Sequence, residues 1–353
     1  MGGIQRIVKN TSECLIRANK EVIIYSTDSA IRSPRFLVVD GIKLKTYPAM
    51  TFEGSYYFPT PRMLSDLLSE KANILHAYNI HALTTLVAYV ARRSRAKPSF
   101  VVSPFYHGAG HTRLARMLWT PYRPLVRKIL KNADGVIVNS KAQRALIERT
   151  FSPTSGIFTV YDGIDLRQIE NSRPFAFDPD HRLLLYVGRL EKYKNVHVAI
   201  AAMKHLPENY QLYIVGNGTF KMYLEELSES LNLKERIHFL GPQPDHVVYR
   251  WVKTAHALVH LSAVESFGLT CIESIAAGTP VVANLDGFGL SETVAMYPDY
   301  IRAYSVVDEP LSRLVKLIME TAEMKPIKVD VSQFSWDVVA EGVNAVYQQL
   351  NYK

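Results

Sequence analysis

Short apolar runs alternate with longer stretches of helical periodicity along the whole chain. In the first half, the apolar runs predict strands at 21–27, 74–77, 100–103, 136–139 and 157–161, with helices near 4–19, 80–95, 113–132 and 141–150. In the second half, they predict strands at 183–188, 212–216, 237–241, 258–261 and 281–284, with helices near 195–205, 219–231, 245–254, 270–277 and 334–350. Wholly apolar strands that alternate with helices are typical of parallel sheets covered on both faces. The pattern therefore predicts an α/β chain with two doubly wound domains.

A polar segment, residues 166–182, separates the two series of strands and carries Pro174 and Pro179. We interpret it as a linker. The expected organisation is, in chain order, an N-terminal Rossmann-like domain at 1–165, this linker, a C-terminal Rossmann-like domain at 183–330, and a final helical segment at 331–353 that could pack on either domain.

The first element departs from the doubly wound pattern. Such a domain normally begins with a strand, which a glycine turn and a helix follow. Here the glycine pair Gly2-Gly3 comes first and the predicted helix follows directly. The N-terminal domain is thus predicted to lack its first strand. Either the sequence starts downstream of the true start or this sheet is one strand short, and we expect the first.

Composition places the chain among ordinary globular proteins. Hydrophobic residues make up 48% of its 353 residues and charged residues 21%, which excludes a disordered chain. Cys14 and Cys271 are too few for a disulfide framework, and this indicates a reducing compartment. The first residues contain no apolar signal segment, and Arg6 occupies the position where a myristoylation signal needs Ser or Thr. We therefore expect a cytoplasmic protein.

The longest stretch without Lys, Arg, Asp or Glu, residues 72–91, is long enough to span a bilayer. It contains Asn73, His76, Asn79 and His81, whose polar groups would be costly in hydrocarbon. A buried strand followed by a buried helix explains this stretch better than a membrane span.

Positive charge is concentrated in the first half of the chain. Residues 1–180 hold 25 Lys and Arg against 14 Asp and Glu, a balance of +11, whereas residues 181–353 hold 16 against 19, a balance of −3. Most of the excess lies in residues 89–150, which contain 13 basic and two acidic residues. Such a block favours an anionic partner, but a solvated basic face explains it equally well.

Within this block, residues 112–131 interleave basic side chains with Leu, Met, Trp and Tyr. This mixture suits a segment that lies on anionic lipid, which would place a peripheral membrane protein on the cytoplasmic face of the membrane. The alternative is an amphipathic helix whose apolar face lies in the core. We find no nucleic-acid-binding motif, so nucleic acid is the least favoured anionic partner.

Two cations follow the first strand of the second domain. That strand ends at Gly188, at the edge where open α/β sheets bind ligands, and Arg189 comes next. Lys194 lies five residues further on, at the start of the predicted helix. Because arginine binds phosphate oxygens bidentately and lysine acts as a point charge, the pair predicts a clamp for a diphosphate. The alternative is two surface cations.

Two glutamates follow a later strand. The segment 264–273 reads Val-Glu-Ser-Phe-Gly-Leu-Thr-Cys-Ile-Glu, with Glu265 just after the strand and Glu273 on the next helix. Carboxylates match vicinal diols, so Glu273 would bind a ribose and Glu265 a sugar on the other side of the phosphates. Backbone N–H groups at the helix start suit a phosphate. They belong to Phe267, Gly268 and Leu269. The alternative is that Glu265 caps the helix and Glu273 is a surface residue.

These motifs resemble those of the retaining family 4 glycosyltransferases (glycosyl transferases group 1), which have the GT-B fold of two Rossmann-like domains with an inter-domain cleft. The resemblance covers most of the chain and is most specific in the C-terminal half. It is carried there by Gly188-Arg189, Lys194-Asn195, the Glu265-x7-Glu273 spacing with Ser-Phe-Gly-Leu between, and Ala-Ala-Gly-Thr-Pro-Val-Val at 276–282. The N-terminal half agrees more loosely, through Gly2-Gly3, Val-Asn-Ser at 138–140, and 160–165, where Asp162 replaces the Asn of the family's Asn-Gly-Val-Asp.

The resemblance implies that the protein is a hexosyltransferase, which moves a sugar from a nucleotide diphosphate donor to an acceptor and retains the anomeric configuration. Arg189 and Lys194 would stabilise the charge that grows on the leaving diphosphate, which is usually the largest catalytic contribution. Glu265 would hold the donor sugar and Glu273 would bind the ribose.

It also implies that the base rests near Gly216, Gly218 and the Leu240-Gly241 turn, and that Gly2-Gly3 lies beside the donor phosphates. No metal or cofactor is implied, because protein cations take the place of Mg²⁺ and the nucleotide-sugar is a co-substrate. A D-x-D string does occur at 178–180, but it lies in the proline-bearing segment, where we interpret it as a turn.

The N-terminal domain is expected to hold the acceptor, a glycan or a lipid-linked or anionic molecule. The family has a histidine after the strand at 100–103, and His107, followed by Gly108, is the closest match. It would orient the acceptor, contact the donor sugar or move a proton. A buried histidine whose polar groups are satisfied is the alternative, and for His76, a weaker candidate, we expect a place in the core or just behind the site.

Two other functions stay open. A nucleotide-sugar epimerase of the same fold would consume its donor without an acceptor, but the Arg–Lys clamp and the two glutamates favour transfer. The chain could instead be a non-catalytic homologue that binds nucleic acid or a membrane through residues 89–150.

Overall fold

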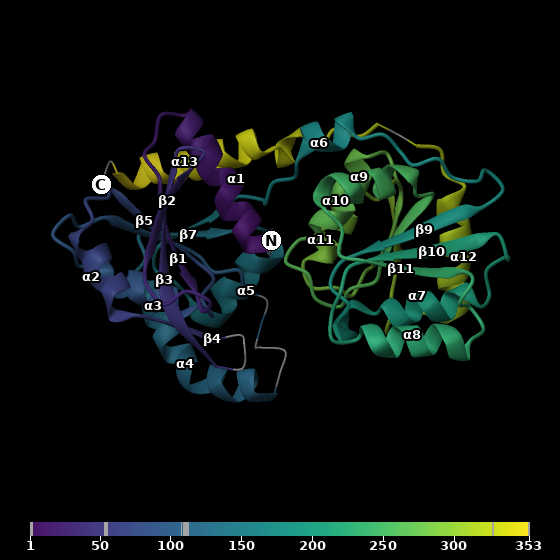
Figure 1. Ribbon diagram of the computed structural model, residues 1–353, viewed down its shortest axis with the longest axis horizontal. Coiled ribbons are helices and arrows are strands. Elements are labelled where there is room, and N and C mark those ends of the chain that lie inside the picture. The colour runs from purple at the N-terminus through teal and green to yellow at the C-terminus, as the bar shows by residue number, and fades with distance from the viewer. Residues whose placement is uncertain (1–2, 53–55, 107, 109–112, 327, 352–353) are drawn as a thin grey trace. The chain divides into compact units, whose positions relative to one another are not determined.

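A computed structural model describes residues 3–52, 56–106, 108, 113–326 and 328–351. They form two compact units, which Figure 1 shows. Unit 1 comprises Met1–Gly163 and Trp336–Lys353, and unit 2 comprises Ile164–Ser335. Both contain parallel strands joined by helices, so the predicted α/β fold with two Rossmann-like domains is confirmed.

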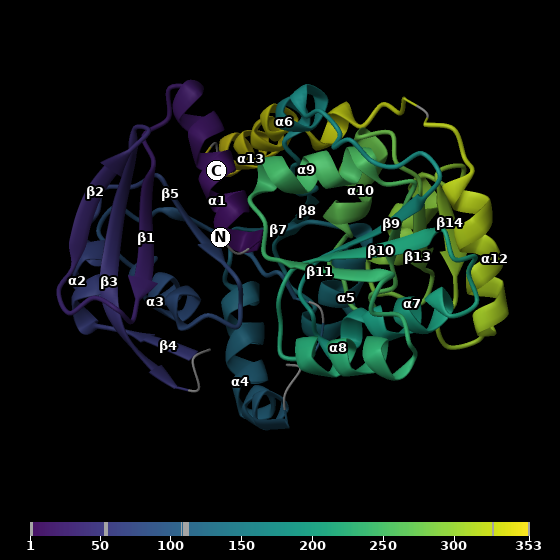
Figure 2. The same cartoon turned by 45° about the vertical axis from the view of Figure 1, so that its right-hand side comes forward.

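Unit 1 contains two four-stranded sheets. The first comprises β1 (Ile23–Asp28), β2 (Arg35–Val39), β3 (Ile42–Phe52) and β4 (Tyr56–Pro59). In it β1 runs parallel to β3, while β2 and β4 run antiparallel to it, and β1 to β3 lie side by side in Figure 2. The second sheet is wholly parallel and comprises, in spatial order, β5 (Ile74–Tyr78), β6 (Ser99–Ser103), β7 (Gly135–Val138) and β8 (Gly156–Thr159).

Helices cover both faces of the β5–β8 sheet. The helices of unit 1 are α1 (Gly3–Arg17), α2 (Pro61–Ser69), α3 (Leu83–Ala91), α4 (Arg113–Lys131), α5 (Lys141–Phe151) and α13 (Trp336–Asn351). Phe100 and Val102 of β6 belong to the core that the sheet forms with α3, α4 and α5. Val101 points to the opposite face and packs against α13. Because successive strand residues alternate between faces, a strand with both faces covered is apolar throughout.

The last helix, whose packing partner the sequence left open, packs on unit 1. One buried cluster joins α13 to the sheet, and it consists of Val101, Ile137, Val343, Val346 and Leu350. The start of the helix requires a glycine opposite it, because a Cβ atom at Gly163 would stand 2.4 Å from the indole ring of Trp336. The end of the chain therefore completes the core of unit 1.

The sequence pattern did not predict β2, β3 and β4. The four apolar residues 36–39 of β2 are all exposed, so this strand lacks the alternation that marks a half-buried strand. Because β2 and β4 are antiparallel, unit 1 is not the purely parallel domain that was expected. Among the described residues no strand pairs with both β1 and β5, so unit 1 has two sheets where a doubly wound domain has one.

The uncharged stretch 72–91 forms β5 and α3, as predicted. In the part of the chain that the structure describes, no helix combines the length and the apolar character that a membrane span needs. The apolar side of α4, with Trp119, Val126 and Ile129, is buried in the core of unit 1. This arrangement matches the alternative of an ordinary amphipathic helix.

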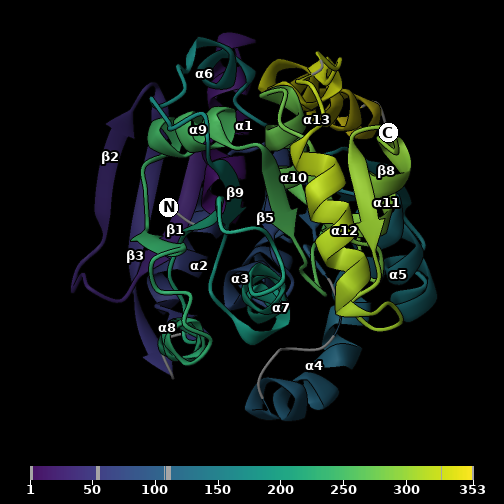
Figure 3. The same ribbon diagram turned by 90° about the vertical axis from the view of Figure 1, so that its right-hand side faces the viewer.

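Unit 2 contains one parallel six-stranded sheet with the order β11-β10-β9-β12-β13-β14. Its strands are β9 (Arg182–Val187), β10 (Tyr210–Val215), β11 (Ile237–Gly241), β12 (Ala257–His260), β13 (Val281–Asn284) and β14 (Ile301–Tyr304). Its α-helices are α6 (Leu166–Asn171), α7 (Val196–Met203), α8 (Lys221–Ser230), α9 (Asp245–Thr254), α10 (Leu269–Ala276), α11 (Leu290–Met296) and α12 (Leu311–Ala322). Helices α7, α8 and α12 share one core with the sheet, and α12 is the yellow helix in the foreground of Figure 3.

The segment 166–182, interpreted as a linker, belongs to unit 2. Its first residues form α6, whose Ile169 is fully buried, and Phe175 stacks against Trp251 of α9. The apolar side chains at these positions pack on unit 2 although the segment contains two prolines. The segment is therefore part of unit 2 and not a free linker. The D-x-D string does form a turn, in which Asp178 accepts a hydrogen bond from the backbone N–H of Asp180.

Candidate active site

The predicted donor site lies where the strand order of unit 2 reverses. β9 is followed along the chain by β10 on one side and pairs with β12 on its other side. Open α/β sheets bind ligands at this reversal, outside the carboxyl ends of the strands. Arg189 follows β9, and Glu265 follows β12, so the fold brings the two predicted clusters to neighbouring strand ends.

Glycines allow the loops after β9 and β10 to pack closely. A Cβ atom at Gly216 would stand 1.9 Å from the carbonyl oxygen of Gly188, and one at Gly218 would stand 2.2 Å from that of Leu190. Gly216 also has φ of +137°, which other residues rarely adopt. Nearby, the Gln243 side chain donates to the carbonyl of Leu240 at 2.8 Å. Gly216, Gly218 and Leu240, which were predicted to lie near the base, thus belong to closely packed loops.

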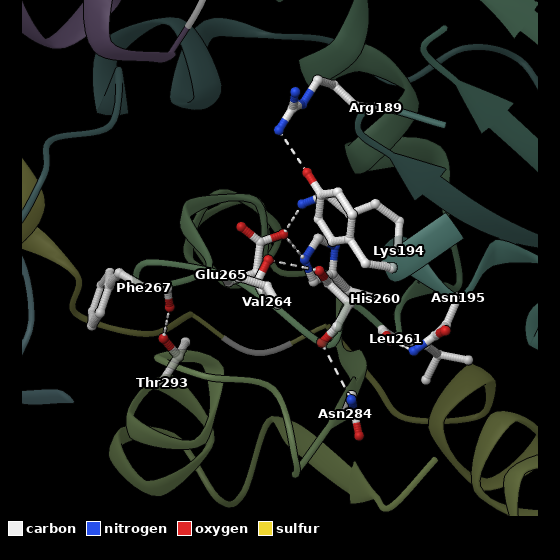
Figure 4. Close-up of polar contacts among 12 residues, drawn as sticks. Arg189, Lys194, Asn195, His260, Leu261, Val264, Glu265, Phe267, Asn284 and Thr293 are labelled. Atoms are coloured by element: carbon white, nitrogen blue, oxygen red, sulfur yellow. Dashed lines mark hydrogen bonds and ion pairs between the residues drawn. The ribbon is translucent and has the colours of Figure 1, made fainter. Parts of the chain in front are cut away.

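Lys194 and Glu265 form an ion pair, shown in Figure 4. Lys194 is buried, at 8% exposure, and its Nζ donates to Oε1 of Glu265. The same oxygen accepts from Nε2 of His260 at 3.0 Å. Burial alone would raise the pKa of Glu265, but the hydrogen bonds and charges of His260 and Lys194 outweigh it and lower this pKa to about 2. Glu265 is therefore ionised at neutral pH.

Arg189 is exposed, unlike Lys194. Its Nη2 donates to the hydroxyl of Tyr193 at 2.6 Å, and its backbone carbonyl accepts from the hydroxyl of Tyr186 at 2.8 Å. The Tyr193 ring lies 6.0 Å from the Arg189 guanidinium and 5.1 Å from the Lys194 ammonium. One aromatic ring therefore faces both cations, which keeps the two positive charges close to the same strand end.

Side chains from three further elements hold the loop that carries Glu265. Asn195, in the left-handed conformation, donates to the carbonyl of Leu261 at 2.9 Å, and Asn284 donates to that of Ser262 at 3.3 Å. Thr293 donates to the carbonyl of Phe267. The loop is thereby anchored to the start of α7, the end of β13 and α11, which fixes the direction of the Glu265 side chain.

Helix α10 begins directly after this loop, with Gly268 as its N-cap at φ of +87°. The ring of Phe267 is buried against Phe334, so only the backbone of this residue can serve a ligand. Glu273 is buried, at 8% exposure, and accepts from the hydroxyl of Tyr249 at 3.3 Å. The alternatives for the two glutamates are thus wrong, because Glu265 binds Lys194 and Glu273 does not lie on the surface.

The remaining predicted residues belong to unit 1. Gly3 is an exposed first residue of α1 with open space beside it, so no steric demand for glycine exists there. Gly2 and His107 lie outside the described residues. His76 is partly buried, and its ring nitrogens lie 2.6 Å from the hydroxyl of Tyr347 and 2.8 Å from that of Ser103.

Sequence reasoning missed side chains that contact those of Glu265, Arg189 and Glu273. They are His260, Tyr193 and Tyr249. His260 ends an otherwise apolar strand, and a polar residue in that position is the one signal that indicated it. Cys271 is fully buried, and burial raises the pKa of its thiol, so it packs as a small apolar residue.

Comparisons with known proteins agree with this fold. The profile of the glycosyl transferases group 1 matches residues 167–326, and that of glycosyltransferase family 4 matches residues 1–168. D-inositol 3-phosphate glycosyltransferase of Corynebacterium urealyticum is 34% identical over 344 residues, which cover 83% of this chain and 77% of that protein. An uncharacterized glycosyltransferase of Methanocaldococcus jannaschii is 28% identical over 232 residues, 60% of this chain and 59% of its own length.

Two solved structures resemble the whole chain. Sucrose-phosphate synthase from Thermosynechococcus elongatus superposes with a TM-score of 0.78 at 22% identity, covering 99% of this chain and 94% of that one. Anabaena HepE in complex with UDP and glucose superposes with a TM-score of 0.65 at 17% identity, covering 99% and 92%. At such identities the likeness concerns the fold alone.

Fold, site and relatives together define a glycosyltransferase of the two-domain GT-B type. The chain belongs to glycosyltransferase family 4.

Proposed function

We propose that this glycosyltransferase transfers a sugar from a nucleoside diphosphate donor and retains the configuration at the anomeric carbon. The observation that carries the proposal is the ion pair of Lys194 with Glu265 beside exposed Arg189, at the reversal of the strand order. An ionised carboxylate and two cations at one strand end can hold a sugar and its leaving diphosphate at the same time.

Each residue has a defined task in this proposal. Arg189 lies on the surface and turns from Tyr193 to the phosphates, where its fork binds two oxygens. Lys194 shares its remaining N–H groups between Glu265 and the diphosphate, so the negative charge that develops as the glycosidic bond breaks meets a fixed cation. Glu265 accepts hydrogen bonds from the donor sugar, and Glu273 accepts them from the ribose.

The proposed reaction requires no metal bound to the protein, because the two side-chain cations neutralise the leaving group. Among the residues that the structure describes, no group of three His, Cys, Asp or Glu side chains is arranged to hold a metal ion. The leaving diphosphate can still carry Mg²⁺ from solution. The proposal is that the protein itself supplies no ligands to a metal ion.

The proposed acceptor is an anionic polyol. The relative from Corynebacterium urealyticum is named for D-inositol 3-phosphate, a phosphorylated polyol. In unit 1, the side of α4 that faces away from the core exposes Arg123, Arg127, Lys128 and Lys131. The same cations make binding to an acidic lipid surface on the cytoplasmic side a second proposal, which flotation with anionic and neutral vesicles would test.

The test of the proposed function is incubation with a panel of uridine, guanosine and adenosine diphosphate sugars, with and without inositol phosphates. We expect one donor to be consumed only when an acceptor is present, and proton NMR of the product to show the donor's anomeric configuration. Consumption without an acceptor would indicate an epimerase, and an inverted product would refute retention.

A further inference from the structure

His260 is a titratable side chain that contacts the predicted site residue Glu265 from inside the sheet of unit 2. It is the last residue of β12, with 2% of its surface exposed. The ring of Tyr186, from β9, lies parallel to it at 6.3 Å. The strand pairing fixes the backbone of His260, and the neighbouring aromatic ring restricts its side chain. The imidazole is therefore held as firmly as a core residue.

Its two ring nitrogens have different surroundings. Nε2 lies 3.0 Å from Oε1 of Glu265, and because a carboxylate only accepts hydrogen bonds, this nitrogen carries the proton. Nδ1 is buried, and among the described residues it has no hydrogen-bond partner. All the polar interaction of the ring is thus directed at one oxygen of Glu265.

The two oxygens of Glu265 are consequently not equivalent. Oε1 accepts from both Lys194 and His260. In the part of the chain that the structure describes, Oε2 has no hydrogen-bond partner, and Figure 4 shows this second oxygen turned away from both nitrogens. The side chain is 20% exposed, so water or a ligand reaches it. Two donors on Oε1 fix the rotation of the carboxylate and leave Oε2 to a ligand.

Lys194 alone would not fix that rotation. If it serves the diphosphate as well, as the proposed function requires, its ammonium moves between two anions and its bond to Glu265 weakens when donor binds. The bond from His260 does not change, because this residue is anchored in β12 and, among the described residues, its Nε2 contacts no acceptor other than Glu265.

We propose that His260 is a positioning residue: it holds Oε1 of Glu265 through Nε2–H, so that Oε2 faces a hydroxyl of the donor sugar throughout the reaction. This inference rests on the proposed function. It assigns a role to a residue outside the Arg–Lys and Glu–Glu motifs.

Two substitutions at this position separate the hydrogen bond from the packing. In His260→Gln the amide nitrogen takes the place of Nε2 and can still donate to Glu265. In His260→Asn the shorter amide takes the place of Nδ1 and cannot reach it. Each removes the imidazole and leaves a neutral amide, so they form a matched pair, with thermal melting as the check that both fold.

We expect His260→Asn to lower kcat for sugar transfer about 10- to 100-fold, which is the effect of losing a hydrogen bond to a charged group. His260→Gln should stay within about threefold of the wild type, on the same order as a retained bond. Affinity for the nucleoside diphosphate without its sugar should change little in both, because Arg189 and Lys194 bind that part. Equal activity of the two variants, whether both are high or both are low, would overturn the inference.

A second measurement does not depend on the stability of either variant alone. In a Glu265→Ala background, adding His260→Asn should cost no further activity, because the acceptor that His260 holds is already gone. Additive losses would overturn the inference. The two possible failures are distinguishable. If the wild-type protein transfers no sugar from any donor in the panel, the proposed function itself fails. If the wild type transfers sugar but the His260→Asn and His260→Gln variants have equal kcat values, only the inference about His260 fails.

Discussion

Asp162 is a buried carboxyl of unit 1, and replacing it by asparagine should stabilise this unit at neutral and alkaline pH. The carboxyl is buried, with 7% of its residue exposed, and Oδ2 accepts from the side chain of Asn139 at 2.6 Å. Burial raises the pKa of Asp162 from 3.8 to about 7, although the hydrogen bond from Asn139 opposes this. The folded protein therefore holds a proton that the unfolded chain releases at pH values between these two.

The sign and size of the effect follow from this difference in pKa. Between pH 4 and 7 the folded state binds more protons, so the free energy of unfolding falls as pH rises, and the loss is complete above pH 7. One pKa unit corresponds to 1.36 kcal/mol, so the buried carboxyl lowers the free energy of unfolding by up to about 4 kcal/mol at pH 8. At pH 5 this reduction is smaller by about 3 kcal/mol. Asparagine keeps an oxygen for Asn139 and never ionises.

Urea unfolding of wild type and Asp162→Asn at pH 5 and pH 8 measures this effect. We expect the variant's advantage to grow by about 3 kcal/mol between the two pH values. Burial lowers the pKa of His76 to about 3, so this residue makes the free energy of unfolding rise with pH up to about 6.5. Its contribution is the same in the wild type and in the variant, and it therefore cancels from the comparison. Asp299→Asn, at an exposed position, is the control. An advantage that is the same at both pH values would refute the reasoning.

Three predictions concern activity. Glu265→Gln should lower kcat about 10²-fold or more while affinity for the nucleoside diphosphate stays within a few fold, and transfer near the wild-type rate would contradict the proposed sugar contact. Arg189→Ala and Lys194→Ala should each slow transfer about 10²- to 10³-fold, with the surface variant Arg313→Ala as control, and losses below threefold would remove them from the site. EDTA should leave transfer measurable, and complete loss restored by Mg²⁺ or Mn²⁺ would refute metal independence.

The second half of the chain was the more predictable one. All five strands expected there exist, and β12 and β13 are buried throughout, but β14 and the helices α11 and α12 were missed. The sequence predicted that Arg189, Lys194 and Glu265 lie close together, because the carboxyl ends of parallel strands meet at the same edge of a sheet. That Lys194 binds Glu265 directly did not follow, because the choice between ion pair and free cation depends on side-chain geometry.

The first half shows where sequence pattern fails. β2 exposes Phe36 and Leu37 along with its other apolar residues, so nothing in their order distinguishes a strand from a loop. The spacing of apolar residues predicted that α13 is a helix but not which sheet it covers, because Val343 and Leu350 could pack against any apolar surface. His260 escaped notice because a lone histidine in a strand is usually a core residue, and its partner is set by a loop conformation.

The packing of α13 has a consequence for biosynthesis. Residues 336–351 leave the ribosome after all of unit 2, yet they cover β6 and β7, which were made long before. At about 5–20 residues per second, roughly 170 residues of intervening chain keep that face of the sheet open for on the order of 10–30 s. The nascent protein therefore carries a bare apolar surface that a chaperone has time to bind, and a premature stop codon before residue 336 would leave it bare for good.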